Sequence, residues 1–260
     1  MKKVVAINGS PRMEKGNTEM LLSAFIQGMT DAGSKVEEYY ASCLKVKSCT
    51  CGGMYCWYKK PGECSIKDDM ELLYPRLRQA EILVLATPVY VPLPGDMQNI
   101  MNRLCALVEP VLENREGRTR ARFYEDVRIE KMVLVSTCGW WEDGNFGTVV
   151  RIVEEFAKVG NVEFAGAVLR PHADLMKGEG VLTEQGEAVL EAARRAGFEL
   201  IKDGKMNEET LEAVSHPLIA EDDLRHIYNE RHVATAGMME YADREKIVCD
   251  TPGMRVRTGE

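Results

Sequence analysis

The chain has 260 residues, of which 45% are hydrophobic and 28% charged, so it is long enough to bury a large apolar core. Its 33 Lys and Arg residues against 41 Asp and Glu residues give a formal net charge of −8, which argues against nucleic acid as a partner. No apolar run reaches the ~20 residues that cross a bilayer, and the first residues, MKKVVAINGS, show no signal-peptide pattern. We therefore expect a cytoplasmic protein with neither a membrane nor a nucleic-acid partner.

Short apolar or alternating runs predict strands, and longer segments with apolar residues at helical spacing predict the helices between them. The predicted strands cover 3–8, 35–40, 81–87, 131–138 and 162–169. The predicted helices begin at Thr18 and recur at about 67–79, 96–108, 147–159 and 183–202. Strands that alternate with helices in this way form a parallel sheet covered on both faces, with right-handed crossovers. The sequence therefore predicts a three-layer α/β fold.

The pattern changes near the end of the chain. A charged segment that predicts a helix, EDDLRHIYNERH, is followed by a Gly/Pro-containing end, and no further strand is predicted. We divide the chain into an α/β domain at 1–203, with a cysteine-rich insertion at 43–64, and a C-terminal extension at 204–260. Apolar side chains of the extension predict packing on a neighbouring subunit, as a homodimer or homotetramer, with packing on its own domain as the alternative. These residues are Leu211, Val214, Leu218, Ile219, Leu224, Ile227 and Tyr228.

Three loops follow predicted strands and share one edge of the sheet, where ligands of open parallel sheets bind. The first, NGSPRMEKGNT at 8–18, joins a strand to a helix N-terminus and offers hydroxyls and backbone N–H groups that suit a phosphate. The second begins TPVY at 87–90, and the third reads STCGWW at 136–141. A tyrosine and a proline in the second loop suit the face of a planar cofactor.

The GSPR and GNT segments of the first loop resemble the phosphate loop of the flavodoxin-like NAD(P)H-dependent FMN reductases. The TPVY loop and the following PGDMQNIMNR at 94–103 resemble the flavin-ring loop and next helix of that family. The resemblance covers roughly residues 1–200 and implies a flavodoxin-like sandwich with a five-stranded parallel sheet of order 2-1-3-4-5. It also implies FMN as cofactor and NAD(P)H as co-substrate. The expected FMN contacts are Ser10, Arg12, Asn17 and Thr18 at the phosphate, and Pro88, Val89, Tyr90, Thr137, Cys138, Gly139 and Trp140 at the ring.

Five of the eight cysteines fall between Cys43 and Cys64, which in a reducing compartment indicates metal or redox chemistry. Cys56-Trp57 with Cys64 and a Lys-Asp-Asp-Met segment resembles the iron–sulfur flavoproteins. The resemblance implies a [4Fe-4S] cluster on Cys49, Cys51, Cys56 and Cys64, with Cys43 as a substitute ligand. The spacing Cys-x-Cys-x4-Cys-x7-Cys departs from the compact CxxCxxC of that branch. Four-cysteine zinc, a redox disulfide and free thiols therefore stay open as alternatives.

No paired carboxylates or His/Asp constellation is found, as expected if a flavin carries the chemistry. Surface or interface roles are expected for the histidines at 172, 216, 226 and 232. For Tyr90 and Trp140, a core or interface role is the alternative to contact with the flavin ring. A basic segment could receive the phosphates of a nicotinamide dinucleotide or be a solvated linker. It contains Arg118, Arg120 and Arg122.

The leading interpretation is an FMN-dependent oxidoreductase that passes electrons from NAD(P)H to a small acceptor such as a quinone or flavin. The alternative is an iron–sulfur flavoprotein that relays single electrons between redox protein partners. A third interpretation is a redox-sensing module whose cysteines respond to oxidants. Iron in the cysteine-rich insertion would favour the electron carrier, whereas its absence would favour hydride transfer.

Overall fold

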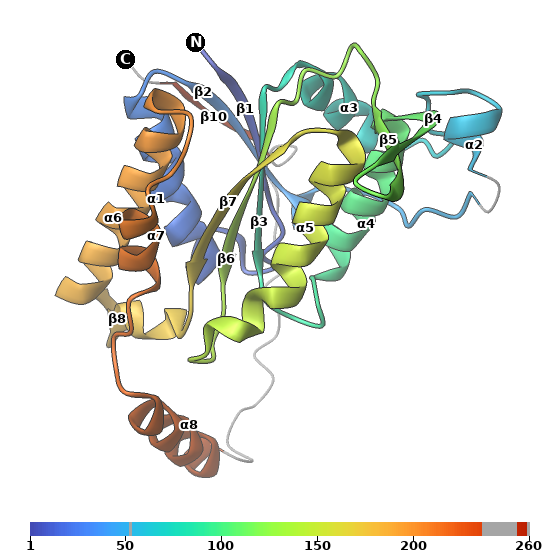
Figure 1. Cartoon of the computed structure of the whole chain (residues 1–260). Helices are drawn as coiled ribbons and strands as arrows, with labels where there is room; N and C mark the ends of the chain where they lie inside the picture. The colour runs from blue at the N-terminus through green and yellow to red at the C-terminus, as the bar shows by residue number, and fades with distance from the viewer. Residues whose placement is uncertain (52–53, 236–253, 259–260) are drawn as a thin grey trace.

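A six-stranded sheet of order β10-β2-β1-β3-β6-β7 forms the centre of the molecule (Figure 1). The computed structural model describes residues 1–51, 54–235 and 254–258, and at 231–235 we describe the backbone only. Five of the strands are parallel in the predicted order, and the sixth, β10 (Met254–Thr258), pairs antiparallel with β2. The parallel strands are β1 (Lys3–Asn8), β2 (Lys35–Tyr40), β3 (Ile82–Pro88), β6 (Lys131–Thr137) and β7 (Glu163–Arg170).

Helices cover both faces of this sheet, as the alternating pattern predicted (Figure 1). On one face lie α1 (Asn17–Asp31), α6 (Glu184–Lys202) and α7 (Glu208–Ser215), and on the other lie α3 (Met70–Gln79), α4 (Gly95–Arg103) and α5 (Gly147–Gly160). No helix among the described residues is long and apolar enough to cross a membrane. The remaining helices are α2 (Tyr55–Tyr58) and α8 (Glu221–Thr235), with 3-10 turns η1 (Met13–Lys15), η2 (Ala41–Cys43), η3 (Leu104–Leu107), η4 (Asp143–Phe146) and η5 (Ala173–Met176).

The apolar strands bury both of their faces. In β1, Val4 and Ala6 belong to the core beneath α1 and α6, whereas Val5 and Ile7 belong to the core beneath α3, α4 and α5. Successive side chains of a strand point to opposite faces, so a run without polar interruptions supplies two cores at once. This double burial fixes the strand ends, and with them the loops that follow.

Two expectations about the connections are wrong. The arginine-rich linker after α4 is a hairpin of β4 (Val108–Arg115) and β5 (Arg118–Phe123), in which ion pairs with glutamates offset the charge of the arginines. The chain end expected to lack a strand forms β10, which a charged, alternating MRVRT sequence on a sheet edge does not reveal by hydrophobicity. A further short hairpin joins β8 (Lys177–Gly178) to β9 (Val181–Leu182).

The C-terminal extension packs at least in part on its own chain. Val214 and Leu224 are buried, and Leu211 and Leu218 contact the core beneath α1 and α6. These contacts account for part of the apolar surface that was expected to meet a neighbouring subunit. The homo-oligomer stays a prediction.

Helices α1 and α6 approach each other at glycines. A Cβ atom on Gly28 would lie 1.7 Å from the Arg194 carbonyl oxygen, and one on Gly197 would lie 2.0 Å from the Phe25 carbonyl oxygen. Real side chains do not tolerate such distances, and both obstacles are backbone atoms of a packed helix. The two helices are therefore held at a separation that only glycine permits.

We expect Gly197→Ala to lower the free energy of unfolding by at least about 2 kcal/mol, because the backbone of α1 must move to admit the methyl group. Gly147→Ala is the matched control, since a Cβ added to this first residue of α5 would meet no atom within 4 Å. Urea denaturation measures both. Equal effects of the two substitutions would contradict the close helix contact.

Candidate functional site

The loop after β1 is held in a compact turn by its own polar groups. Asn8 Oδ1 accepts the Ser10 N–H at 2.9 Å, and Ser10 Oγ accepts the Arg12 N–H at 3.3 Å. A Cβ atom on Gly16 would lie 2.7 Å from Ser10 Oγ, so this close approach to Ser10 requires a glycine. Arg12 is exposed and has no ion-pair partner among the described residues. The loop thus presents a hydroxyl, a guanidinium and the N-terminus of α1, a donor set that suits a phosphate.

The first helix is joined to the end of β6. Thr18 Oγ1 lies 2.7 Å from Thr137 Oγ1, and both residues are buried. Asn17 Nδ2 donates to Asp174 Oδ1 at 2.6 Å, which ties the same turn to the segment after β7. Two of the four predicted phosphate residues therefore already contact other strand ends, and Ser10 and Arg12 are left at the turn itself.

The loop after β3 lies beside the loop after β6. Val89 donates its N–H to the Thr137 carbonyl at 2.9 Å, and Tyr90 donates its N–H to the Pro92 carbonyl at 3.0 Å across a cis Val91-Pro92 peptide. Tyr90 is 49% exposed and Val91 is 99% exposed. The core alternative for Tyr90 is therefore wrong, because its ring stands open at the sheet edge.

The third loop is anchored to the end of β7. Cys138 donates its N–H to the Arg170 carbonyl at 3.0 Å, and its own carbonyl accepts the Ala173 N–H at 2.9 Å. Burial raises the pKa of the Cys138 thiol, so this cysteine is not an activated nucleophile. Trp140 is 67% exposed, which excludes its core alternative as well. All three loops, with Pro88 and Gly139 inside them, thus meet at the carboxyl edge of the sheet.

Sequence reasoning missed the loop after β7, although the same strand-end rule applies to its RPHAD sequence. Arg170 and His172 are fully buried, and Arg170 Nη2 lies 2.6 Å from His172 Nε2. Arg170 also donates to the carbonyls of Val214 and His216, at 2.6 and 2.9 Å. This pair fastens the start of the extension to the sheet edge.

The surface or interface role expected for the histidines is wrong for His172. Its Nε2 accepts the Leu218 N–H at 3.0 Å, and the Trp141 ring stacks on it with a centroid distance of 6.5 Å. His216 and His226 are exposed as expected, and the side chain of residue 232 lies outside the described atoms. Burial, with the neighbouring Arg170 charge, lowers the pKa of His172 to about 4.

The extension also reaches the third loop through α8, which lies beyond the carboxyl ends of the strands (Figure 1). Tyr228 donates its hydroxyl to the Gly139 carbonyl at 2.9 Å and lies 3.3 Å from Asp174 Oδ2. Asp174 therefore joins Asn17 of the first loop to Tyr228 of the extension. Neither residue carries a motif that the sequence alone could have singled out.

A buried ion pair clamps the base of the cysteine-rich insertion. Arg103, at the end of α4, contacts both carboxylate oxygens of Asp68 at 2.7 and 3.0 Å. Arg103 also donates to the carbonyls of Lys47 and Ile66, and Asp68 accepts the Lys47 N–H at 2.9 Å. Both partners are almost fully buried, so removing either would leave a charge without compensation. The two ends of the insertion are fixed by this clamp.

The thiols of the insertion gather against η3. Cys49 Sγ and Cys51 Sγ are 3.5 Å apart, and Cys56 lies within hydrogen-bonding reach of Cys105, a residue the sequence prediction left out. Burial, together with Cys105 and other thiols, raises the pKa of Cys56 to about 12. Cys64 lies beside the Arg103 guanidinium. Within the described residues, no three His, Cys, Asp or Glu side chains are arranged to hold a metal ion.

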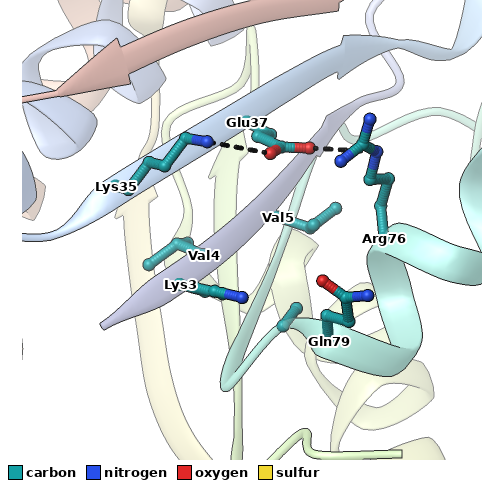
Figure 2. Close-up of a pocket in the computed structure, with 8 residues that line it drawn as sticks. Lys3, Val4, Val5, Lys35, Glu37, Arg76 and Gln79 are labelled. Atoms are coloured by element: carbon teal, nitrogen blue, oxygen red, sulfur yellow. Dashed lines mark ion pairs between the residues drawn. The ribbon is translucent and has the colours of Figure 1, made fainter. Parts of the chain in front are cut away.

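A cavity of about 90 Å³ lies at the opposite edge of the sheet, near the amino ends of β1 and β2 (Figure 2). Glu37 lines this cavity and forms ion pairs with Lys35 and with Arg76, each at 3.6 Å. None of the predicted cofactor residues lines this cavity. We therefore place the candidate site at the three loops, on the strength of their joined strand ends.

Comparison with known sequences identifies the family of the chain. The sequence family described as NADPH-dependent FMN reductase matches residues 2–164. An iron-sulfur flavoprotein of Archaeoglobus fulgidus is 35% identical over 118 residues, which are 44% of this chain and 51% of that protein. One of Methanocaldococcus jannaschii is 33% identical over 120 residues, 44% of this chain and 58% of that protein. The chain spans about half the length of these curated relatives.

Solved structures show the same fold at low sequence identity. An NAD(P)H:quinone oxidoreductase from Methanothermobacter marburgensis has a TM-score of 0.50 at 21% identity, with 76% of this chain and 95% of that chain covered. An azoreductase from Bacillus anthracis has a TM-score of 0.54 at 13% identity, with 78% and 100% covered. The predicted flavodoxin-like α/β fold is confirmed.

The lowered pKa of His172 makes the free energy of unfolding depend on pH. The unfolded chain takes up a proton at this histidine near pH 6.5 and the folded chain only near pH 4, so its contribution is present above pH 6.5 and lost on acidification. We expect the stability advantage of wild type over His172→Gln to shrink by up to about 3 kcal/mol between pH 7 and pH 4. Urea unfolding at both pH values measures it, with the exposed His226→Gln as control. An advantage independent of pH would contradict a neutral buried imidazole.

Proposed function

The chain belongs to the NADPH-dependent FMN reductase family, and we propose that it binds FMN at the three loops and passes electrons from NAD(P)H to a small acceptor. The observation that carries the proposal is the joining of the loops after β1, β3 and β6 by direct hydrogen bonds at one edge. FMN, when bound, supplies the hydride and electron transfer. The residues of the chain supply binding, orientation and exclusion of water.

The first loop fits the phosphate end of the cofactor. Ser10 offers its hydroxyl, Arg12 offers a guanidinium that has no ion-pair partner within the described part of the chain, and the turn precedes the N-terminus of α1. Charge-assisted contacts of this kind are among the stronger ones in proteins. Asn17 and Thr18 act by shaping the turn, because their side chains already bond to Asp174 and Thr137.

The second and third loops fit the flavin ring. Pro88, Val89 and Tyr90 would line one side, with Thr137 to Trp140 completing the ring pocket. The exposed faces of Tyr90 and Trp140 can cover a planar ring and bury part of its surface from water.

The basic segment is better explained as a paired surface than as a dinucleotide site. Arg120 lies 2.8 Å from Glu155, and Arg122 lies 2.8 Å from Glu109. Arg118 reaches the same Glu155 at 3.6 Å. Receiving a phosphate would require these pairs to break, so the acceptor and NAD(P)H are proposed to approach the open edge at Tyr90 and Trp140 instead.

Arg12→Gln tests the proposed phosphate contact. We expect this variant to bind FMN about tenfold more weakly, the loss typical of one hydrogen bond to a charged group. Arg128→Gln is the control, because Arg128 is also exposed but lies at the amino end of β6. Quenching of FMN fluorescence during titration gives both dissociation constants. Equal affinities for the two variants would contradict this placement.

A second candidate function is favoured by the thiols around η3. Four thiolates can hold a [4Fe-4S] cluster, and this insertion has Cys49, Cys51, Cys56 and Cys64, with Cys105 beside Cys56. The Arg103 guanidinium lies beside Cys64, and its buried Nε has no hydrogen-bond partner among the described residues, so this side chain would offer a donor to a cluster bound there. In this proposal the protein relays single electrons, and the insertion rearranges to bring the thiols around the iron.

Anaerobic reconstitution with iron and sulfide tests the second candidate. We expect wild type to retain about four iron and four acid-labile sulfide per chain, and Cys64→Ser and Cys105→Ser to retain much less. Cys138→Ser should match wild type, because Cys138 lies at the third loop and outside the thiol group. Wild type without iron after reconstitution would remove the electron carrier and leave the reductase.

A further inference from the structure

The edge strand β10 pairs with β2 along its whole length, from Met254 opposite Tyr39 to Thr258 opposite Lys35. Figure 1 shows β10 at the margin of the sheet beside β2. Its side chains alternate, and Arg255 and Arg257 are half-buried on one face. These two arginines reach beneath the sheet edge toward α1.

Arg257 meets two buried carboxyl groups. Its Nη2 donates to Glu38 Oε2 at 2.9 Å and to Ser23 Oγ at 3.1 Å, and it lies 3.4 Å from Glu19 Oε1. Glu38 is 0% exposed and Glu19 is 5% exposed. Placing two carboxyl groups in the interior is costly unless a cation offsets them. Arg257 is the charge that does so from β10.

Glu19 connects Arg257 to the loop after β1, residues 8–18, which is the proposed phosphate turn. Its Oε2 accepts the Asn8 Nδ2–H at 2.8 Å, and Asn8 Oδ1 accepts the Ser10 N–H at 2.9 Å. The Asn8 amide thus donates to Glu19 through its nitrogen and accepts from Ser10 through its oxygen, so both of its ends are fixed. Ser10 is therefore linked to Glu19 through the side-chain amide of Asn8.

Arg255 makes a second connection to the same turn. It forms an ion pair with Glu14 of η1 and lies 3.6 Å from Glu19 Oε1. Its guanidinium also stacks over the Tyr40 ring, 5.4 Å from the centroid. The strand therefore contacts the turn from two sides, through a buried carboxylate and through an exposed one.

The electrostatics explain why the cation matters. Burial, and then the neighbouring Glu19, raises the pKa of Glu38 to about 8, whereas Arg257 acts in the opposite direction. Glu38 Oε1 has no hydrogen-bond partner among the described residues. Without Arg257, the Glu38 carboxyl group would hold its proton more tightly, and the contacts of Arg257 with Glu38, Ser23 and Glu19 would be lost.

We infer that β10 is a positioning element of the proposed FMN site, which sets the phosphate turn through Arg257, Glu19 and Asn8. The inference rests on the proposed function for its ligand, but the hydrogen-bond path exists in the chain without it. Arg257 is a positioning residue, because it touches neither the turn's hydroxyl nor the expected phosphate. The C-terminal extension thereby takes part in the site that residues 1–203 were expected to complete alone.

Arg257→Met tests this role, with two readouts. We expect FMN to bind about tenfold more weakly and the Ser10 amide proton to exchange about tenfold faster in the protein without FMN. Amide protons in α6 serve as the internal reference, because general destabilisation would raise their exchange as well. Thr258→Ala, on the exposed side of the same strand, should leave both readouts unchanged.

A second substitution separates positioning from simple loss of packing. Arg257→Lys, which keeps the charge, should lie between wild type and Arg257→Met. Unchanged Ser10 exchange in Arg257→Met, or an Arg257→Lys variant that is no closer to wild type than Arg257→Met, overturns the inference. Wild type that binds no FMN refutes the proposed function, and the exchange data then decide the inference alone.

Discussion

The hydrogen bond between the Thr18 and Thr137 hydroxyls joins α1 to the end of β6, and the arrangement of the candidate site depends on it. Both side chains are buried, so each hydroxyl needs a partner and the two loops are held in one register. Val89 adds a backbone hydrogen bond to Thr137 from the loop after β3. Three segments that are far apart in the sequence thereby become one surface.

Much of this arrangement could be predicted from the sequence because it follows from hydrophobic patterning. The runs KVVAIN and EILVLAT bury both faces and have few alternatives to a central parallel strand, which also places Ser10 and Tyr90 at one edge. β10 could not be predicted in this way, since MRVRT buries its arginines through ion pairs with Glu19 and Glu38. The same holds for Arg170 and His172, whose partners are backbone groups supplied by the extension.

The thiol group shows the same limit. Spacing along the chain identified the cysteines between 43 and 64, but Cys105 joins them only because α4 ends beside the insertion. The clamp of Arg103 on Asp68 fixes that meeting point, and it lies within the PGDMQNIMNR and Lys-Asp-Asp-Met segments that first suggested the two family resemblances. Breaking such a buried pair would leave a charge in the interior without compensation, so the two segments are held together where they meet. The candidate site and the cysteine-rich insertion are therefore linked through α4.

The central claim is that FMN bound at the three loops accepts electrons from a nicotinamide cofactor. The most direct measurement is the visible absorption of FMN-loaded protein under anaerobic conditions as NADPH is added. The account predicts that the visible flavin band, on the order of one FMN per chain, bleaches on addition of NADPH and returns when a quinone is supplied. A bound flavin whose absorption does not change with either NADPH or NADH would contradict it.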